Sequence, residues 1–174
     1  METVADVFRR ILRSLEIEYE NSESHVVLLR DIQRLSVLGH VFENLRSGST
    51  LKVQRWIGRR LEEAGVAEPS ERILEQKNIL QLEWRERNNP GELQPVPEYL
   101  YLRVRDESSK QDAMLEVIKD IYSLRLRKLL SLASKRVSPS MIENLTREEE
   151  ALYQVILTII DEWMSFIMPR GDGK

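Results

Sequence analysis

The chain of 174 residues has no cysteine, seven glycines, six prolines and two histidines. Without cysteine, a disulfide scaffold, a thiolate zinc site and a cysteine nucleophile are excluded. The low glycine and proline content argues against a loop-rich or collagen-like protein. Charge of one sign is not in excess, since 26 lysines and arginines stand against 29 aspartates and glutamates, and this argues against a strongly basic nucleic-acid binder. The composition is typical of a helix-rich intracellular protein.

Long hydrophobic runs are also missing. The most apolar stretch, 151–168, contains Asp161 and Glu162, and carboxylates inside a membrane span are costly. The first twenty residues carry acids and arginines throughout and lack the apolar core of a secretory signal. We therefore expect no membrane helix and a cytoplasmic location.

The first 69 residues predict a helix and a small β-rich module. Apolar residues from Val4 to Leu15 recur at helical spacing and predict a helix over 3–20. The segments that follow predict strands at 25–32, around 36–42 and at 47–54, a helix over 55–65 and a brief strand at 66–68.

From residue 70 onward the pattern becomes helical. Apolar spacing predicts helices over 70–89, 109–136 and 146–168, and a proline-containing loop over 88–97. The segment 98–106 favours a short helix, although its β-branched and aromatic residues leave a strand open. The fold class is therefore mainly α with a small α/β module. We predict two domains, 1–69 (the first helix and the β-rich module) and 70–174 (a helical bundle for oligomerisation).

No pattern typical of catalysis or of ligand binding occurs. His25 and His40 have neither a metal-ligand spacing nor a neighbouring carboxylate cluster, and the glycines lack the spacing of phosphate-binding loops. The acidic run 148–150 stands at a predicted helix start, where carboxylates usually complement the helix dipole. We expect no catalytic residues, no cofactor and no metal.

Three arginines, Arg55, Arg59 and Arg60, share one short predicted helix. Several cations on one surface are what nucleic-acid binding requires, so these residues are candidates for contact with DNA or a partner. Glu62 and Glu63 close by favour the alternative of an internally paired, solvated face. A homodimeric nucleic-acid-binding regulator that uses this helix therefore stays open as a second function.

The last predicted helix, 146–168, is apolar over most of its circumference. Such a helix must be covered on several sides, and few other helices are available to cover it. Tryptophan and methionine are also enriched at protein interfaces. The alternative is a well-filled monomer core. We predict a subunit interface formed by nine residues: Leu80, Trp84, Leu152, Ile156, Ile159, Ile160, Trp163, Met164 and Ile167.

Two stretches resemble the GINS family. The first, within 26–69, contains VVLLRDI and LRSGSTLKVQRWIGRRLEEAGVAEP and resembles the small β-rich B domain of GINS subunits, with Gly58 where the family often has alanine. The second, within 97–153, contains EVIKDIYSLRLRKLLSLAS and ENLTREEEALY and resembles the helical A domain. A B-like module before the A-like domain is similar to the archaeal "two-three" type. The opening helix lies outside this pattern.

The resemblance implies a non-catalytic scaffold subunit. GINS subunits assemble through their helical domains, in archaea as a 2:2 tetramer with the "five-one" type, and associate with the MCM helicase and a RecJ-like protein at the replication fork. DNA contact would then be indirect, and the location would be cytoplasmic at the nucleoid. The family-signature positions that the resemblance carries over are Arg125 and Lys128 on the long helix, and Asn144 and Thr146 at the start of the last helix.

Overall fold

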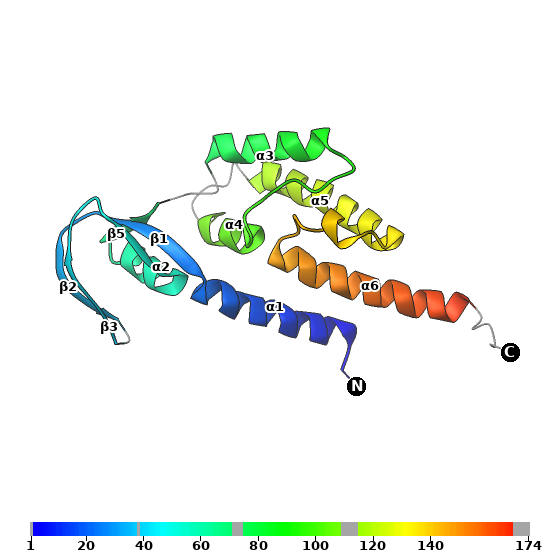
Figure 1. Ribbon diagram of the computed structural model, residues 1–174, viewed down its shortest axis with the longest axis horizontal. Coiled ribbons are helices and arrows are strands. Elements are labelled where there is room, and N and C mark those ends of the chain that lie inside the picture. Colours follow the sequence, from blue (N-terminus) through cyan, green and yellow to red (C-terminus); the bar gives the residue numbers. More distant parts are fainter. Residues whose placement is uncertain (1, 38, 71–74, 109–114, 169–174) are drawn as a thin grey trace. The chain divides into compact units, whose positions relative to one another are not determined.

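The computed structural model describes residues 2–37, 39–70, 75–108 and 115–168, and Figure 1 shows the elements along the chain. Contacts group the chain into two compact units, Glu16–Arg72 and Met1–Leu15 with Ile73–Lys174. The N-terminal residues thus group with the helical part, whereas the predicted division keeps 1–69 together. The predicted division into domains 1–69 and 70–174 stays a prediction, because contacts alone do not show which parts of the chain fold independently.

The small unit is built on a three-stranded antiparallel sheet. Its strands are β1 (Glu23–Leu28) in the centre, flanked by β4 (Thr50–Gln54) and β5 (Ala67–Pro69). Val26 on β1 pairs with Leu51 on β4, and both side chains are buried. Alternate residues of each strand face the core, so the paired residues lie on the same, buried face of the sheet. The predicted strand positions at 25–32, 47–54 and 66–68 are confirmed to within a few residues.

Helix α2 (Arg55–Glu63) begins directly after β4 and confirms the predicted helix over 55–65. It buries Ile57 and Leu61 in the core of the module. A Cβ at Gly58 would lie 3.1 Å from Cγ1 of Val26. The helix is therefore so close to the central strand that an alanine at this position would force neighbouring atoms to shift.

A hairpin of β2 (Ile32–Val37) and β3 (His40–Leu45) forms a separate two-stranded sheet. The prediction of one strand around 36–42 is therefore wrong. Gly39 has a φ of +88°, and this left-handed conformation turns the chain back in the middle of that segment. The partly buried side chains of Leu35 and Phe42 pack the hairpin against the core of the module.

The helical unit contains α3 (Gln76–Asn88), α4 (Leu100–Ser108), α5 (Leu115–Lys135) and α6 (Arg147–Ile167), with a 3₁₀ turn η2 (Pro139–Met141) before α6. Helix α5 contributes to two apolar clusters. Ile121 packs with α3 and α4, and Leu129 packs in a cluster that includes Tyr153 of α6. The mainly α fold is confirmed, and α4 confirms the short helix favoured for 98–106, starting at Leu100. Parts of the predicted helices, 71–74 and 109–114, lie outside the described residues.

Helix α1 (Val4–Asn21) confirms the helix predicted over 3–20. Its start is fixed by Thr3 and Asp6: the Asp6 amide donates to Thr3 Oγ1 at 3.2 Å, and the Thr3 amide donates to Asp6 Oδ2 at 3.1 Å. These bonds satisfy amides that a helix start leaves unpaired. Throughout the described part of the chain, every helix is too short or too polar to cross a membrane.

Candidate subunit interface

A buried ionic network supports the helical unit. Arg125 of α5 is fully buried and donates to both carboxylate oxygens of Glu149 on α6, each at 2.7 Å. It also pairs with Glu86 of α3, which in turn pairs with Lys128 one turn along α5. The two carboxylates and two cations balance in charge, as burial requires. Three helices are therefore joined by one set of ion pairs.

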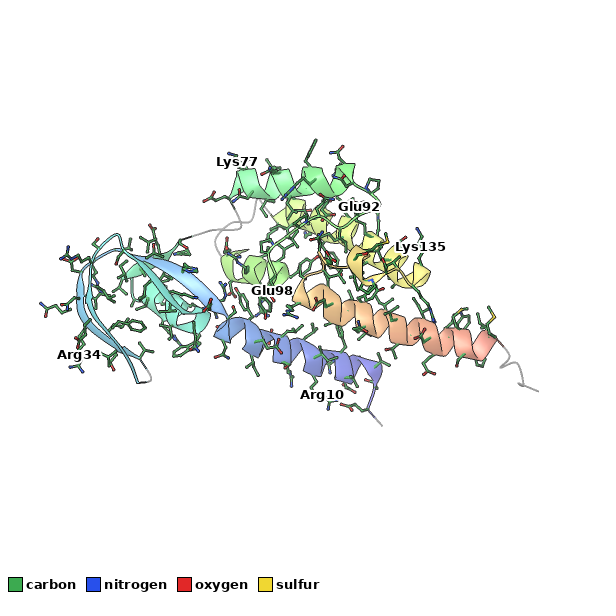
Figure 2. The ribbon with its side chains drawn as sticks, viewed as in Figure 1. Arg10, Arg34, Lys77, Glu92, Glu98 and Lys135 are labelled. Carbon is green, nitrogen blue, oxygen red and sulfur yellow. The ribbon has the colours of Figure 1, made fainter. Side chains whose placement is uncertain are left out.

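The two cations of this network also hold the loop between α3 and α4, part of which is marked by Glu92 in Figure 2. Arg125 donates to the carbonyl of Gln94 at 2.9 Å, and Lys128 donates to the carbonyl of Glu92 at 2.9 Å. Arg125 donates as well to the carbonyl of Asn144, just before α6, at 2.7 Å. These bonds satisfy loop carbonyls that would otherwise be unpaired away from water.

The start of α6 is held by a capping box. Thr146 Oγ1 accepts from the Glu149 amide at 3.1 Å, and Glu149 Oε2 accepts from the Thr146 amide at 3.0 Å. The Asn144 side chain donates to the carbonyl of Leu93 at 3.0 Å. The four signature positions, Arg125, Lys128, Asn144 and Thr146, thus meet at the junction of α5, α6 and the loop after α3.

The electrostatics of the network follow from its burial. Burial lowers the pKa of Arg125, but the hydrogen bonds and charge of Glu149, together with the charge of Glu86, outweigh it and raise that pKa. The Tyr101 hydroxyl of α4 donates to Glu149 Oε1 at 2.6 Å. Burial and the adjacent carboxylate raise the pKa of Tyr101 as well. All of these partners hold side chains in place, and the described residues contain no group of histidines or carboxylates that could hold a metal ion.

One exposed face of α6 is apolar and aromatic in the C-terminal half of the helix. Trp163 is 59% exposed, Phe166 is 82% exposed, and their ring centroids lie 6.1 Å apart. Ile159 and Ile167 are exposed on the same half of the helix. Isolated apolar residues at a surface are ordinary, but a contiguous group including two aromatic rings is typical of an interaction site.

The nine predicted interface residues fall into two groups. Five are exposed: Leu80 and Trp84 on α3, and Ile159, Trp163 and Ile167 on α6. The other four, Leu152, Ile156, Ile160 and Met164, are only partly exposed, and the first three pack against the cluster around Leu129. The sequence-based list omits Phe166. Its apolar type and its helical spacing from Trp163 were the available signals.

A scan against family models matches residues 73–167, more than half of the chain, to the GINS complex protein helical bundle domain. The chain belongs to the GINS family. The match includes α3 to α6, so the ionic network and the exposed face of α6 lie inside the GINS bundle domain, whereas α1 and the β-rich module lie outside the match. Among curated proteins, no relative matches this GINS chain.

In this GINS chain, the three arginines of α2 contact partners within their own compact unit, Glu16–Arg72. Arg55 lies over the ring of Tyr19 at 4.5 Å, Arg59 pairs with Glu20 at 2.7 Å, and Arg60 pairs with Glu63 at 2.7 Å. The internally paired face foreseen as the alternative to DNA contact is thus what the geometry favours. Contact of these arginines with DNA or a partner stays a prediction.

Proposed function

We propose that this chain is the "two-three" type subunit of an archaeal GINS complex and acts there as a non-catalytic scaffold. The order of its parts supports the type, since a β-rich module precedes the GINS bundle domain. In this proposal it assembles with the "five-one" type in a 2:2 tetramer. The tetramer associates with the MCM helicase and a RecJ-like protein at the replication fork, in the cytoplasm at the nucleoid.

The observation that carries the proposal is the exposed apolar face of α6 in a GINS bundle domain. Covering the exposed parts of Ile159, Trp163, Phe166 and Ile167 contributes about 5 kcal/mol, taking about 2 kcal/mol for each fully buried side chain. Association costs roughly 4–15 kcal/mol in lost freedom of motion. The α6 face alone therefore sustains only weak binding, and a stable complex needs a second surface.

Helix α3 offers that second surface. Leu80 and Trp84 are one turn apart and are 42% and 63% exposed. An exposed tryptophan of this kind is a frequent centre of binding energy once it is enclosed by a partner. We assign α3 and α6 together to the contact with the other subunit type.

The experiment is light scattering on size-exclusion eluate, for the chain alone and co-expressed with the "five-one" candidate of its genome. The proposal expects one defined species with the mass of two copies of each chain. A 20.5 kDa monomer that ignores the candidate contradicts it.

The interface is tested by Trp163→Asp, which places an unpaired charge in the apolar contact. Ile160→Asp is a less informative choice, because Ile160 packs against the bundle core and its loss also perturbs the fold. Thr158→Asp is the matched control, since it adds the same charge at an exposed position of the same helix. Trp163→Asp is expected to abolish co-purification while Thr158→Asp retains it. Equal yields for the two variants refute the assigned interface.

A further inference from the structure

The segment 92–98, between α3 and α4, is held by side chains of other elements. Its two ends, Glu92 and Glu98, are labelled in Figure 2. The three consecutive carbonyls at 92, 93 and 94 accept hydrogen bonds from three of the four signature side chains, those of Lys128, Asn144 and Arg125 respectively, at 2.9, 3.0 and 2.9 Å. These bonds end on side chains distant in sequence rather than in a helix or a sheet. The conformation of the segment therefore depends on the tertiary structure.

Burial adds little to these bonds. Within 92–98, all of which the structure describes, the one fully buried side chain is that of Leu93, which is 3% exposed in the cluster around Leu129. Val96 is only partly buried. Pro95 and Pro97 have no amide to donate, so this stretch cannot join a helix interior or a strand ladder. Segments with few buried apolar contacts open at a lower cost in free energy than the core of a domain does.

The same segment is bonded to the start of α6 at two points. The Asn144 side chain donates to the Leu93 carbonyl, and the amide of Arg147, the first residue of α6, donates to the Glu98 carbonyl at 2.9 Å. The carbonyl of Asn144 in turn accepts from Arg125 at 2.7 Å. Amides in the first turn of a helix have no partner inside that helix, so the Arg147 amide depends on the segment for its bond.

We propose that residues 92–98 are a strap that opens as a unit while α3 and α5 stay packed, and that the closed strap fixes the start of α6. Opening releases the Leu93 side chain and the Arg147 amide in one step, because Asn144 is bonded to the segment and lies just before α6. Helix α6 carries the exposed Trp163 at its other end, so a loosened start leaves that end less firmly positioned on α5. The inference goes beyond the proposed function, since it does not depend on what the exposed face binds.

The test is hydrogen exchange of single backbone amides in the full chain, followed by NMR at increasing urea concentrations below the unfolding transition. The amide of Gln94, which donates to Glu86 Oε1 at 3.1 Å, and the amide of Arg147 report on the strap. The amide of Leu129, in the middle of α5, reports on the bundle. Gln94 and Arg147 are expected to exchange through openings of equal free energy. That free energy should lie below the value for Leu129 and depend little on urea, because opening a short segment exposes little surface.

Asn144→Ala removes the bond between the strap and the residue before α6 without leaving a buried charge. The exchange of the Gln94 and Arg147 amides is expected to accelerate by roughly five- to tenfold, which is the effect of one lost hydrogen bond. Asn21→Ala is the matched control, because the Asn21 side chain donates in the same way to the carbonyl of Ile17 in α1, at 2.8 Å. Its loss should leave the exchange of both amides unchanged.

Several results would overturn the inference. A urea dependence of the strap amides equal to that of Leu129 would mean that the segment opens only when the bundle unfolds. Exchange at the rate of an unfolded chain would mean that the segment is not held. In Asn144→Ala, acceleration of Gln94 alone, or of neither amide, would mean that the segment and the start of α6 do not open together. Equal acceleration in Asn144→Ala and Asn21→Ala would mean that exchange follows global stability.

Discussion

The buried guanidinium of Arg125 provides the sharpest test of how the bundle is held together. Arg125→Met fills a similar volume but removes the charge that meets Glu149 and Glu86. Lys128 still pairs with Glu86, whereas Glu149 keeps the Tyr101 hydroxyl and the Thr146 amide as donors. One buried carboxylate thus loses its cation, and the carbonyls that Arg125 held lose a donor.

The expected loss follows from this imbalance. Breaking a buried ion pair by removal of one partner costs about 3–5 kcal/mol, because the other charge remains in a poorly solvated site. A domain is typically stable by only about 5–15 kcal/mol. For a unit near 100 residues, each kcal/mol shifts the melting temperature by about 4–8 °C. Arg125→Met should therefore lower the melting temperature by at least about 12 °C.

The assay is urea and thermal unfolding followed by circular dichroism, with Arg136→Met as the matched control. Arg136 pairs with Asp161, but both side chains are more than half exposed, and such a pair contributes about 0–1 kcal/mol. Replacing Arg125 and Glu149 together should cost less than the sum of the single losses, because no charge is then left alone. Losses for Arg125→Met and Arg136→Met that agree within 1 kcal/mol would refute the reasoning.

Three further predictions concern other parts of the chain. Gly58→Ala gains about 1 kcal/mol in helix propensity but crowds β1 at a cost of about 1–3 kcal/mol, so urea unfolding should show a net loss of stability, and a gain would contradict the close approach. The pKa of Tyr101 is raised in the fold, so its contribution to stability is fully present below the unfolded pKa of about 10 and is lost as the pH rises above that value. The stability of Tyr101→Phe in the same assay should therefore fall less at alkaline pH, and identical pH profiles of stability for the two chains contradict this. Charge reversal to glutamate at Arg55, Arg59 and Arg60 should leave DNA retention in a gel-shift titration unchanged. A steep loss of DNA retention would support the alternative hypothesis of a nucleic-acid-binding regulator.

Much of the local structure could be predicted from the sequence. The capping box of α6 was readable as Thr146 with an acidic run behind it, and the apolar spacing of α5 and α6 was readable from their sequences. These signals succeed because a cap and an amphipathic stripe depend on residues three or four positions apart. The hairpin of β2 and β3 was missed, since a lone Gly39 between two weak strand segments is a faint turn signal.

The role of the signature residues was not readable in the same way. Arg125 and Lys128 were identified as signature positions through the resemblance, and nothing near them in the chain indicated a buried network. Their partner Glu86 is 39 residues from Arg125 and 42 from Lys128, whereas Glu149 is 24 from Arg125. The pairing arises because α3 and α6 both pack against α5, which is a property of the bundle and not of any segment.

The sequence by itself determined that this chain has no thiol chemistry and that it is mainly helical. It also determined that the last helix is apolar over so much of its circumference that it must be covered on more than one side. Periodicity shows that a side chain is apolar and which stripe it joins, but it does not say whether the neighbour comes from the same chain. Only the tertiary structure separated Tyr153, which is buried, from Trp163 and Phe166, which are exposed. The physical reason is that burial depends on what packs against a stripe, and the other helices cover α6 better near its start than near its end.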